Sequence, residues 1–177
     1  SASQGIVCLA RAGRISATSV MVLSPRWAID AAALRELRGK IDVGLHLDWT
    51  SDFAVAAGHG MSLGAAMRRS FLGGFDVGTA RVVIARQLDA FESHWQAPPD
   101  HVDGHQHVQQ FAGIRQALVQ LLRELLALGP PRTGANAAKL ASLDTALAAL
   151  QRNRVFHGLV SPESLFQREG TWRLALR

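Results

Sequence analysis

Two short apolar segments with a helical pattern between them narrow the choice of fold for this chain most. Residues 17–23 (ATSVMVL) are apolar or β-branched nearly throughout, which is typical of a strand covered on both faces. Residues 28–37 have the spacing of a helix that ends at Gly39, and residues 41–48 (IDVGLHLD) form the next strand candidate. Strands and helices that alternate in this way favour βαβ units. The sequence therefore predicts an α/β fold with a mostly parallel sheet or barrel.

Further elements follow the same alternation along the rest of the chain. We expect helices at 4–12, 62–71, 76–95, 114–128 and 142–150, a loop at 50–60, and short strands at 155–160 and 172–176. Within the first helix, Cys8 has apolar neighbours, which predicts a buried thiol. A chain of 177 residues without internal repeats or a clear linker fits one domain, so we expect a single domain over residues 1–177.

The composition argues against several classes of protein. It is 48% hydrophobic and 19% charged, which is that of a globular protein. No apolar run approaches the roughly 20 residues of a membrane span, and no basic segment precedes an apolar one at the N-terminus, so we expect neither a span nor a signal peptide. The net charge of +5 comes from scattered arginines rather than a basic run, which argues against nucleic-acid binding. The single cysteine excludes an internal disulfide and suits a reducing, cytoplasmic compartment. The oligomeric state stays open, a homo-oligomer included.

The segment at residues 101–108 (HVDGHQHV) carries the strongest chemical signal. It contains three of the seven histidines of the chain, with a carboxylate among them at every-other-residue spacing: His101, Asp103, His105 and His107. If the segment is extended, these four side chains project from one face, because alternate residues of a strand point the same way. Imidazole binds Zn, Mn, Fe and Ni, and a neighbouring carboxylate either ligates the ion or orients the imidazole. The pattern predicts a metal site or its surroundings, with a solvated polar strand edge as the alternative.

The strand at residues 41–48 carries a further histidine with two carboxylates on its face. Val43, Leu45 and Leu47 share one face of this strand, and Asp42, Gly44, His46 and Asp48 share the other. An isolated histidine on a strand is usually a core residue or a hydrogen-bonded one. His46, however, lies beside Asp48 near the carboxyl end of the strand, where parallel α/β folds place their sites. We therefore expect His46 to belong to the functional site.

Three segments together resemble the YdjC-type carbohydrate deacetylases, a family that includes chitooligosaccharide deacetylase and hopanoid-biosynthesis-associated members. They are residues 5–22 (GIVCLARAGRISATSVMV), residues 42–47 (DVGLHL) and residues 101–108 (HVDGHQHV). Each segment is moderately specific, and their order and spacing strengthen the resemblance, which covers residues 1–128.

The resemblance implies a NodB-like, irregular (β/α) barrel and a divalent metal ion bound by one Asp and two His. By motif position, His46 in the Gly-Leu-His-Leu segment and His105 in the Asp-Gly-His segment match the two metal-binding histidines. Asp103 and His107 would then be catalytic residues that support the ligands or handle protons. The ion would be zinc or magnesium, since two imidazoles favour zinc or another transition ion, whereas completion by carboxylate and water admits magnesium.

The reaction implied is removal of an acetyl group from an N-acetylated amino sugar or glycoconjugate. The metal would polarise the amide carbonyl and lower the pKa of a bound water, an Asp would act as base, and a His would protonate the leaving amine. Hopanoid-linked glucosamine, chitobiose and other acetylated amino sugars are all open as substrates. Two other functions are also open: a different metallo-amidohydrolase, and a non-catalytic sugar-binding or scaffold protein on a degenerate deacetylase fold.

The sequence departs from the family pattern near both ends. The family begins with a strand that ends in Asp-Asp-Phe-Gly and supplies the third metal ligand and the base, and residue 1 falls just downstream of that position. A Cys-His-Pro-type segment near the C-terminus is also missing, and Gln109 stands where a further histidine is common. We expect that residues omitted from the chain explain these departures. Within the chain as it stands, Asp48 or Asp103 would have to serve as the third ligand.

Overall fold

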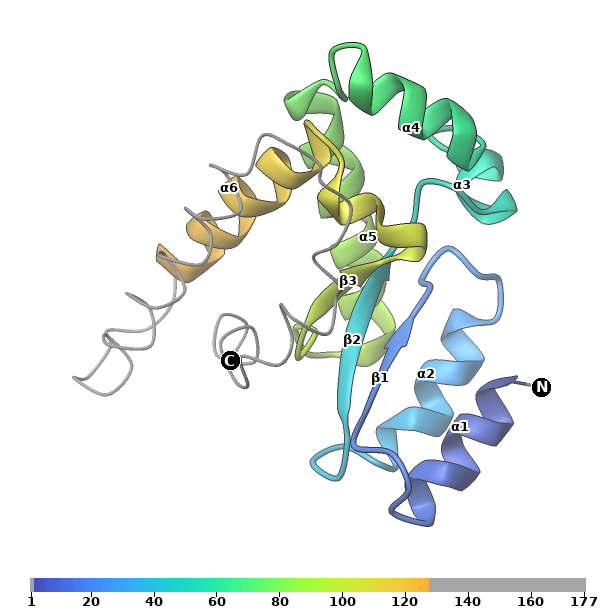
Figure 1. The fold of residues 1–177 in the computed structure, drawn as a ribbon. Coiled ribbons are helices and arrows are strands. Elements are labelled where there is room, and N and C mark those ends of the chain that lie inside the picture. Colours follow the sequence, from blue (N-terminus) through green and yellow to red (C-terminus); the bar gives the residue numbers. More distant parts are fainter. Residues whose placement is uncertain (1, 128–177) are drawn as a thin grey trace. The chain divides into compact units, whose positions relative to one another are not determined.

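The computed structural model of the chain describes the backbone of residues 2–127 and the side chains of residues 3–124. The chain divides into two compact units, residues 1–118 and 119–177; the sheet and the elements up to η1 belong to the first unit, and α6 begins in it. The elements in chain order are α1 (Ala2–Arg11), β1 (Ala17–Val20), α2 (Trp27–Arg35), β2 (Asp42–Leu47), α3 (Asp52–Ala56), α4 (Leu63–Phe71), α5 (Val77–Trp95), β3 (Val102–Gly104), the 3-10 helix η1 (His105–Gln110) and α6 (Ile114–Ala127), as Figure 1 shows. The helix expected at 142–150 and the strands expected at 155–160 and 172–176 lie outside the described residues.

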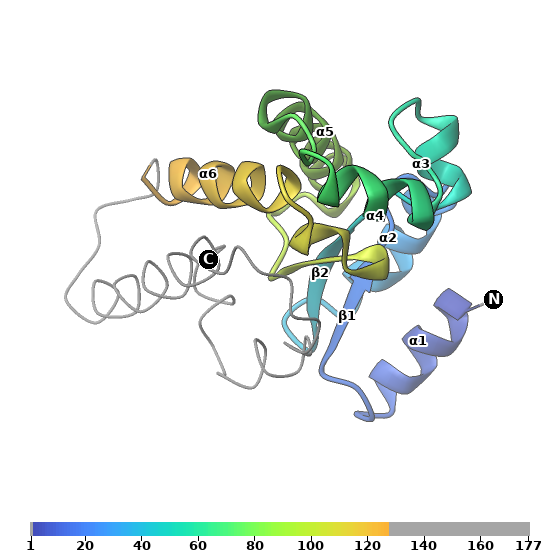
Figure 2. The same ribbon diagram turned by 45° about the horizontal axis from the view of Figure 1, so that its top comes forward.

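The described strands form one parallel sheet in the order β1–β2–β3 (Figures 1 and 2). β1 pairs with β2 so that Ser19 stands opposite Gly44, and β2 pairs with β3 so that His46 stands opposite Asp103. Parallel neighbours need a crossover connection, and helices lie between these strands in the sequence: α2 between β1 and β2, and α3 to α5 between β2 and β3. The predicted α/β class with parallel strands is confirmed.

One face of β2 is the apolar side of the sheet. Three of its side chains are fully buried there: Val43, Leu45 and Leu47. α5 contacts β2 and also packs against α2, where the rings of Trp27 and Phe91 stack with their centroids 5.4 Å apart. Nε1 of Trp27 donates a hydrogen bond to the carbonyl oxygen of Ala90 at 2.8 Å, so burial of this ring leaves its polar group satisfied. The apolar residues of β2 thus belong to the core, and the opposite face of the strand is left to polar residues.

Side-chain caps fix where the middle helices begin. Ser62 caps α4 and Asp76 caps α5, each through a side-chain oxygen that accepts a backbone N–H of the first turn. The sequence predicts both helices at these positions, and both are confirmed. Residues 50–60 are expected as a loop, but they contain the short helix α3, because the Ser51 hydroxyl caps its first turn in the same way.

Two predictions about burial are wrong. Residues 17–23 are expected to be a strand covered on both faces, but β1 ends at Val20 and its residues are exposed or half-buried. The reason is its place in the sheet, since β1 pairs on one side only among the described strands. Cys8 is exposed rather than buried, because the turn of α1 directs Val7 and Ala10 inward and the thiol outward.

Candidate functional site

The candidate site lies on the polar face of the sheet. Side chains that stand opposite each other on neighbouring strands share a face, and so do alternate residues of one strand. Five residues of β1, β2 and the β3 segment share the face turned away from the apolar core: Ser19, Gly44, His46, His101 and Asp103. Strand register therefore brings together residues from three parts of the sequence.

Asp103 links the three strands through its carboxylate. Its Oδ1 lies 2.7 Å from Nδ1 of His46 on β2, and its Oδ2 accepts a hydrogen bond from Oγ of Ser19 on β1 at 2.9 Å. An ionised carboxylate can only accept hydrogen bonds, so Nδ1 of His46 carries a proton and donates it to this contact. In the neutral imidazole the lone pair is then on Nε2. His46 is thereby prepared to bind a cation or accept a proton through Nε2.

His105 supplies a second imidazole beside His46. It follows β3 directly as the first residue of η1, and its ring centroid lies 5.7 Å from that of His46 in an edge-to-face arrangement. A pair of imidazoles suits zinc or another transition-metal ion. Among residues 2–127, however, no group of three or more His, Cys, Asp or Glu side chains is arranged to hold a metal ion. The described residues therefore fit two ligands of a metal centre and do not complete it.

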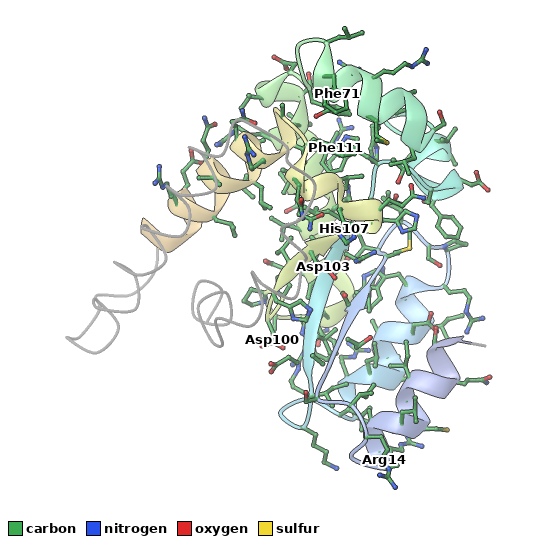
Figure 3. The ribbon with its side chains drawn as sticks, viewed as in Figure 1. Arg14, Phe71, Asp100, Asp103, His107 and Phe111 are labelled. Atoms are coloured by element: carbon green, nitrogen blue, oxygen red, sulfur yellow. The ribbon has the colours of Figure 1, made fainter. Side chains whose placement is uncertain are left out.

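The histidine segment leaves the strand after Gly104, so the prediction of a single extended row is wrong beyond that residue. η1 begins at His105, and His107 is exposed on the turn that follows β3, as Figure 3 shows together with Asp103 on the strand. The turn is tight because the chain folds back over the glycine: a Cβ on Gly104 would lie 2.4 Å from Oε1 of Gln109. The alternation of a strand therefore holds for His101 and Asp103 and fails for His105 and His107.

His101 packs on the middle strand. A Cβ on Gly44 would come within 2.3 Å of Nε2 of His101, so the imidazole occupies the space that a larger residue would fill. The backbone carbonyl of His101 accepts a hydrogen bond from the N–H of Leu45 at 2.9 Å. His101 thus has a packing role in the sheet, which the spacing of the histidines alone does not distinguish from the role of a ligand.

Asp48 organises the end of β2. It is fully buried, and its carboxylate accepts hydrogen bonds from the N–H groups of Thr50 and Ser51 and from the Ser51 hydroxyl. The Gln87 amide on α5 binds the Asp48 backbone twice: Oε1 accepts from its N–H at 2.9 Å, and Nε2 donates to its carbonyl at 3.1 Å. Both carboxylate oxygens are engaged in the turn into α3, so the geometry gives no support to Asp48 as a replacement metal ligand.

Reasoning from the sequence missed Ser19 and Gln87. Ser19 carries no local signal, because its contact with Asp103 depends on the register of three strands. Gln87 carries one that could have been used: it lies three residues after Ile84 and four before Phe91, on the apolar face of α5. A polar side chain at such a position needs a hydrogen-bond partner, because buried polar groups in native proteins are nearly always satisfied.

Replacing Gln106 with glycine is expected to raise the free energy of unfolding by up to about 1 kcal/mol. Gln106 is exposed and lies at φ 51°, in the left-handed region, where a residue with a Cβ is destabilised by about 1–2 kcal/mol and glycine is not. The greater freedom of glycine in the unfolded chain offsets part of this gain. Urea denaturation would measure the change, and Arg86→Gly in the interior of α5 should lower stability instead. A loss of stability in the Gln106 variant would show that the left-handed conformation of Gln106 does not destabilise the fold.

Fold and site together define an α/β protein with a histidine–carboxylate cluster on the polar face of a parallel sheet. The model of the YdjC-like protein family matches residues 1–172, and the chain belongs to this family. The resemblance drawn from the three sequence segments is thereby confirmed. The family is carbohydrate deacetylase-like.

Among solved structures, a "putative cellobiose-phosphate cleavage protein" from Enterococcus faecalis V583 is similar, with a TM-score of 0.57 and 18% sequence identity. The match covers 69% of this chain and 50% of that one, so the present chain spans about half the length of this neighbour. At this identity the likeness shows the fold alone. No curated protein matches the chain. Within the described residues, no helix combines the length and apolar character needed to cross a membrane.

Proposed function

We propose that this chain carries the site of a metal-dependent hydrolase that removes the acetyl group from an N-acetylated amino sugar or glycoconjugate. One observation carries the proposal: in a chain of the YdjC-like family, the rings of His46 and His105 meet beside the Asp103 carboxylate. Parallel α/β folds place their sites at the carboxyl ends of strands, and His46 is the last residue but one of β2. We further propose that the three strands belong to an irregular, NodB-like (β/α) barrel.

His46 and His105 are the proposed protein ligands of a divalent ion, zinc or magnesium. His46 would bind through Nε2, since its Nδ1 is held by Asp103, and a carboxylate in that position orients a ligating imidazole. The further protein ligand would come from outside residues 2–127, which complete no group of three. When bound, the ion would polarise the amide carbonyl and lower the pKa of a bound water.

Asp103 and His107 are the residues proposed to handle protons. Asp103 would keep a proton on Nδ1 of His46 by accepting it in the hydrogen bond between the two side chains. His107 is exposed on η1, within reach of molecules from solvent, and its role would be to donate a proton to the leaving amine.

Purified full-length protein loaded with Zn, Mg, Mn or Co should release acetate from chitooligosaccharides or from conjugates of N-acetylglucosamine. The His107→Ala variant should be slower, by about 100-fold or more if this histidine is the general acid. His94→Ala is the matched control, because His94 is an exposed histidine near the end of α5. If no acetate appeared from any of these substrates with any of these metals, we would abandon the proposal. Hydrolysis of other amides alone would favour a different metallo-amidohydrolase.

A non-catalytic sugar-binding or scaffold protein is the second candidate. The incomplete ligand set among the described residues favours it. Binding of an amino sugar by metal-free protein, without release of acetate when metal is added, would support this candidate. Retention of stoichiometric metal through purification would argue against it.

A further inference from the structure

Ser19 makes the contact that joins β1 to the candidate site. Its Oγ donates a hydrogen bond to Oδ2 of Asp103 at 2.9 Å, although the two residues are 84 positions apart in the sequence. In the register of the sheet Ser19 stands opposite Gly44, whereas Asp103 stands opposite the next residue of that face, His46. The hydrogen bond therefore crosses β2 diagonally, from the level of Gly44 to the level of His46.

The hydrogen bond from Ser19 restrains the Asp103 carboxylate in a way that the contact with His46 alone does not. The terminal torsion of an aspartate is broad, so a carboxylate held at one oxygen can still turn about its axis. With Oδ2 held by Ser19 and Oδ1 facing Nδ1 of His46, both oxygens have a fixed partner. The plane of the carboxylate is then set, and with it the direction in which the imidazole proton must point.

We propose that Ser19 is a positioning residue that keeps the proton of His46 on Nδ1 by holding the Asp103 carboxylate, so that the Nε2 lone pair is presented to the site. The use of that lone pair for metal binding rests on the proposed function, but the effect on the position of the proton does not. Ser19 touches neither the proposed ion nor a reacting atom. It acts through Asp103, as outer partners of metal-ligating histidines do.

The first test is the position of the proton on His46 in metal-free, full-length protein. Side-chain 15N chemical shifts distinguish a protonated from an unprotonated ring nitrogen, and loss of a signal in His46→Gln assigns it. At about pH 8.5, where an ordinary histidine is neutral, the parent should show protonated Nδ1 and unprotonated Nε2. In Ser19→Ala the two shifts should move toward each other, because the second tautomer becomes populated. Unchanged shifts in this variant would overturn the proposal.

Two further variants separate positioning from a general effect on the fold. Ser19→Thr keeps the hydroxyl and should restore the parent shifts. Thr18→Ala removes a hydroxyl from the neighbouring position of β1, which stands opposite the core residue Val43 and faces the other side of the sheet. This control should leave the His46 shifts unchanged. Equal changes in Ser19→Ala and Thr18→Ala would show that β1 is merely loosened, and would count against the proposal.

Zinc titration gives a second readout that does not depend on catalysis. Ser19→Ala should bind Zn²⁺ about 10-fold more weakly than the parent, at the lower end of the effect of outer-shell partners, and Ser19→Thr should bind within about 3-fold of it. Altered 15N shifts together with absent acetate release in the parent would mean that the deacetylase proposal fails while the role of Ser19 stands. Acetate release by the parent with unaltered 15N shifts in Ser19→Ala would mean that the deacetylase proposal stands while the role of Ser19 fails.

Discussion

Replacing His46 with alanine is expected to weaken zinc binding by more than the roughly 100-fold that loss of an outer partner of a metal site costs. The proposed centre has two imidazoles among the described residues, and this change removes the one that Asp103 orients. Elemental analysis after dialysis should find about one ion per parent chain and none in the variant, and acetate release should disappear with the metal.

The control for this experiment must remove a histidine without touching the site. His94→Ala does so, because His94 is exposed in the last turn of α5, and it should retain the parent metal content. His105→Ala should match His46→Ala, and the double variant should add little to either single change if both residues bind the same ion. Parent-like metal content in both single variants would remove the two histidines from the proposed centre.

The Gln87→Met variant is expected to lose about 1–3 kcal/mol of unfolding free energy. The Gln87 side chain is 1% exposed, and methionine fills a similar volume, so little of the loss would come from a cavity. What the change removes is the acceptor for the backbone N–H of Asp48, which then lies buried without a partner. The carbonyl of Asp48 is affected less, because Nε2 of His59 also lies 3.1 Å from it.

Urea denaturation would measure this loss, and Arg86→Met on the exposed side of the same helix should change stability by less than about 0.5 kcal/mol. Zinc affinity should fall as well in the Gln87 variant, since Asp48 follows His46 by two residues and loosening the end of β2 displaces that imidazole. Equal stability of the two methionine variants would show that the paired hydrogen bonds between Gln87 and Asp48 contribute little.

Local patterns in the sequence predict most of the described elements. The strand expected at 41–48 is observed at Asp42–Leu47, and the helix expected at 76–95 is observed at Val77–Trp95. Both agree because the signals are short-range: alternating apolar residues define one face of the strand, and the Asp76 side chain caps the helix. The same reasoning overlooked α3, since its capping residue Ser51 lies in a segment rich in small residues that is also typical of a loop.

The sequence selects three of the side chains that the structure brings together at the candidate site, but it does not predict their arrangement or the presence of Ser19 among them. His46, Asp103 and His105 can be selected by residue type and spacing, whereas the contact between Ser19 and Asp103 depends on how three strands are aligned. A single sequence does not specify that register. Alternation also fails where the backbone turns: Gln106 and His107 both adopt left-handed conformations, which are uncommon for residues other than glycine and have no signal in this segment.

The alternation along β2 separates two kinds of constraint within six consecutive residues. Its odd-numbered side chains lie in the core, on the strand that α5 contacts. His46 lies on the opposite face, where Asp103 holds its ring. Changes at odd-numbered positions would therefore act through the amount of folded protein, and changes at His46 would act on the chemistry of protein that still folds. Measuring abundance and activity separately is thus necessary for interpreting variants of this strand, since a loss of function at neighbouring positions would have unrelated causes.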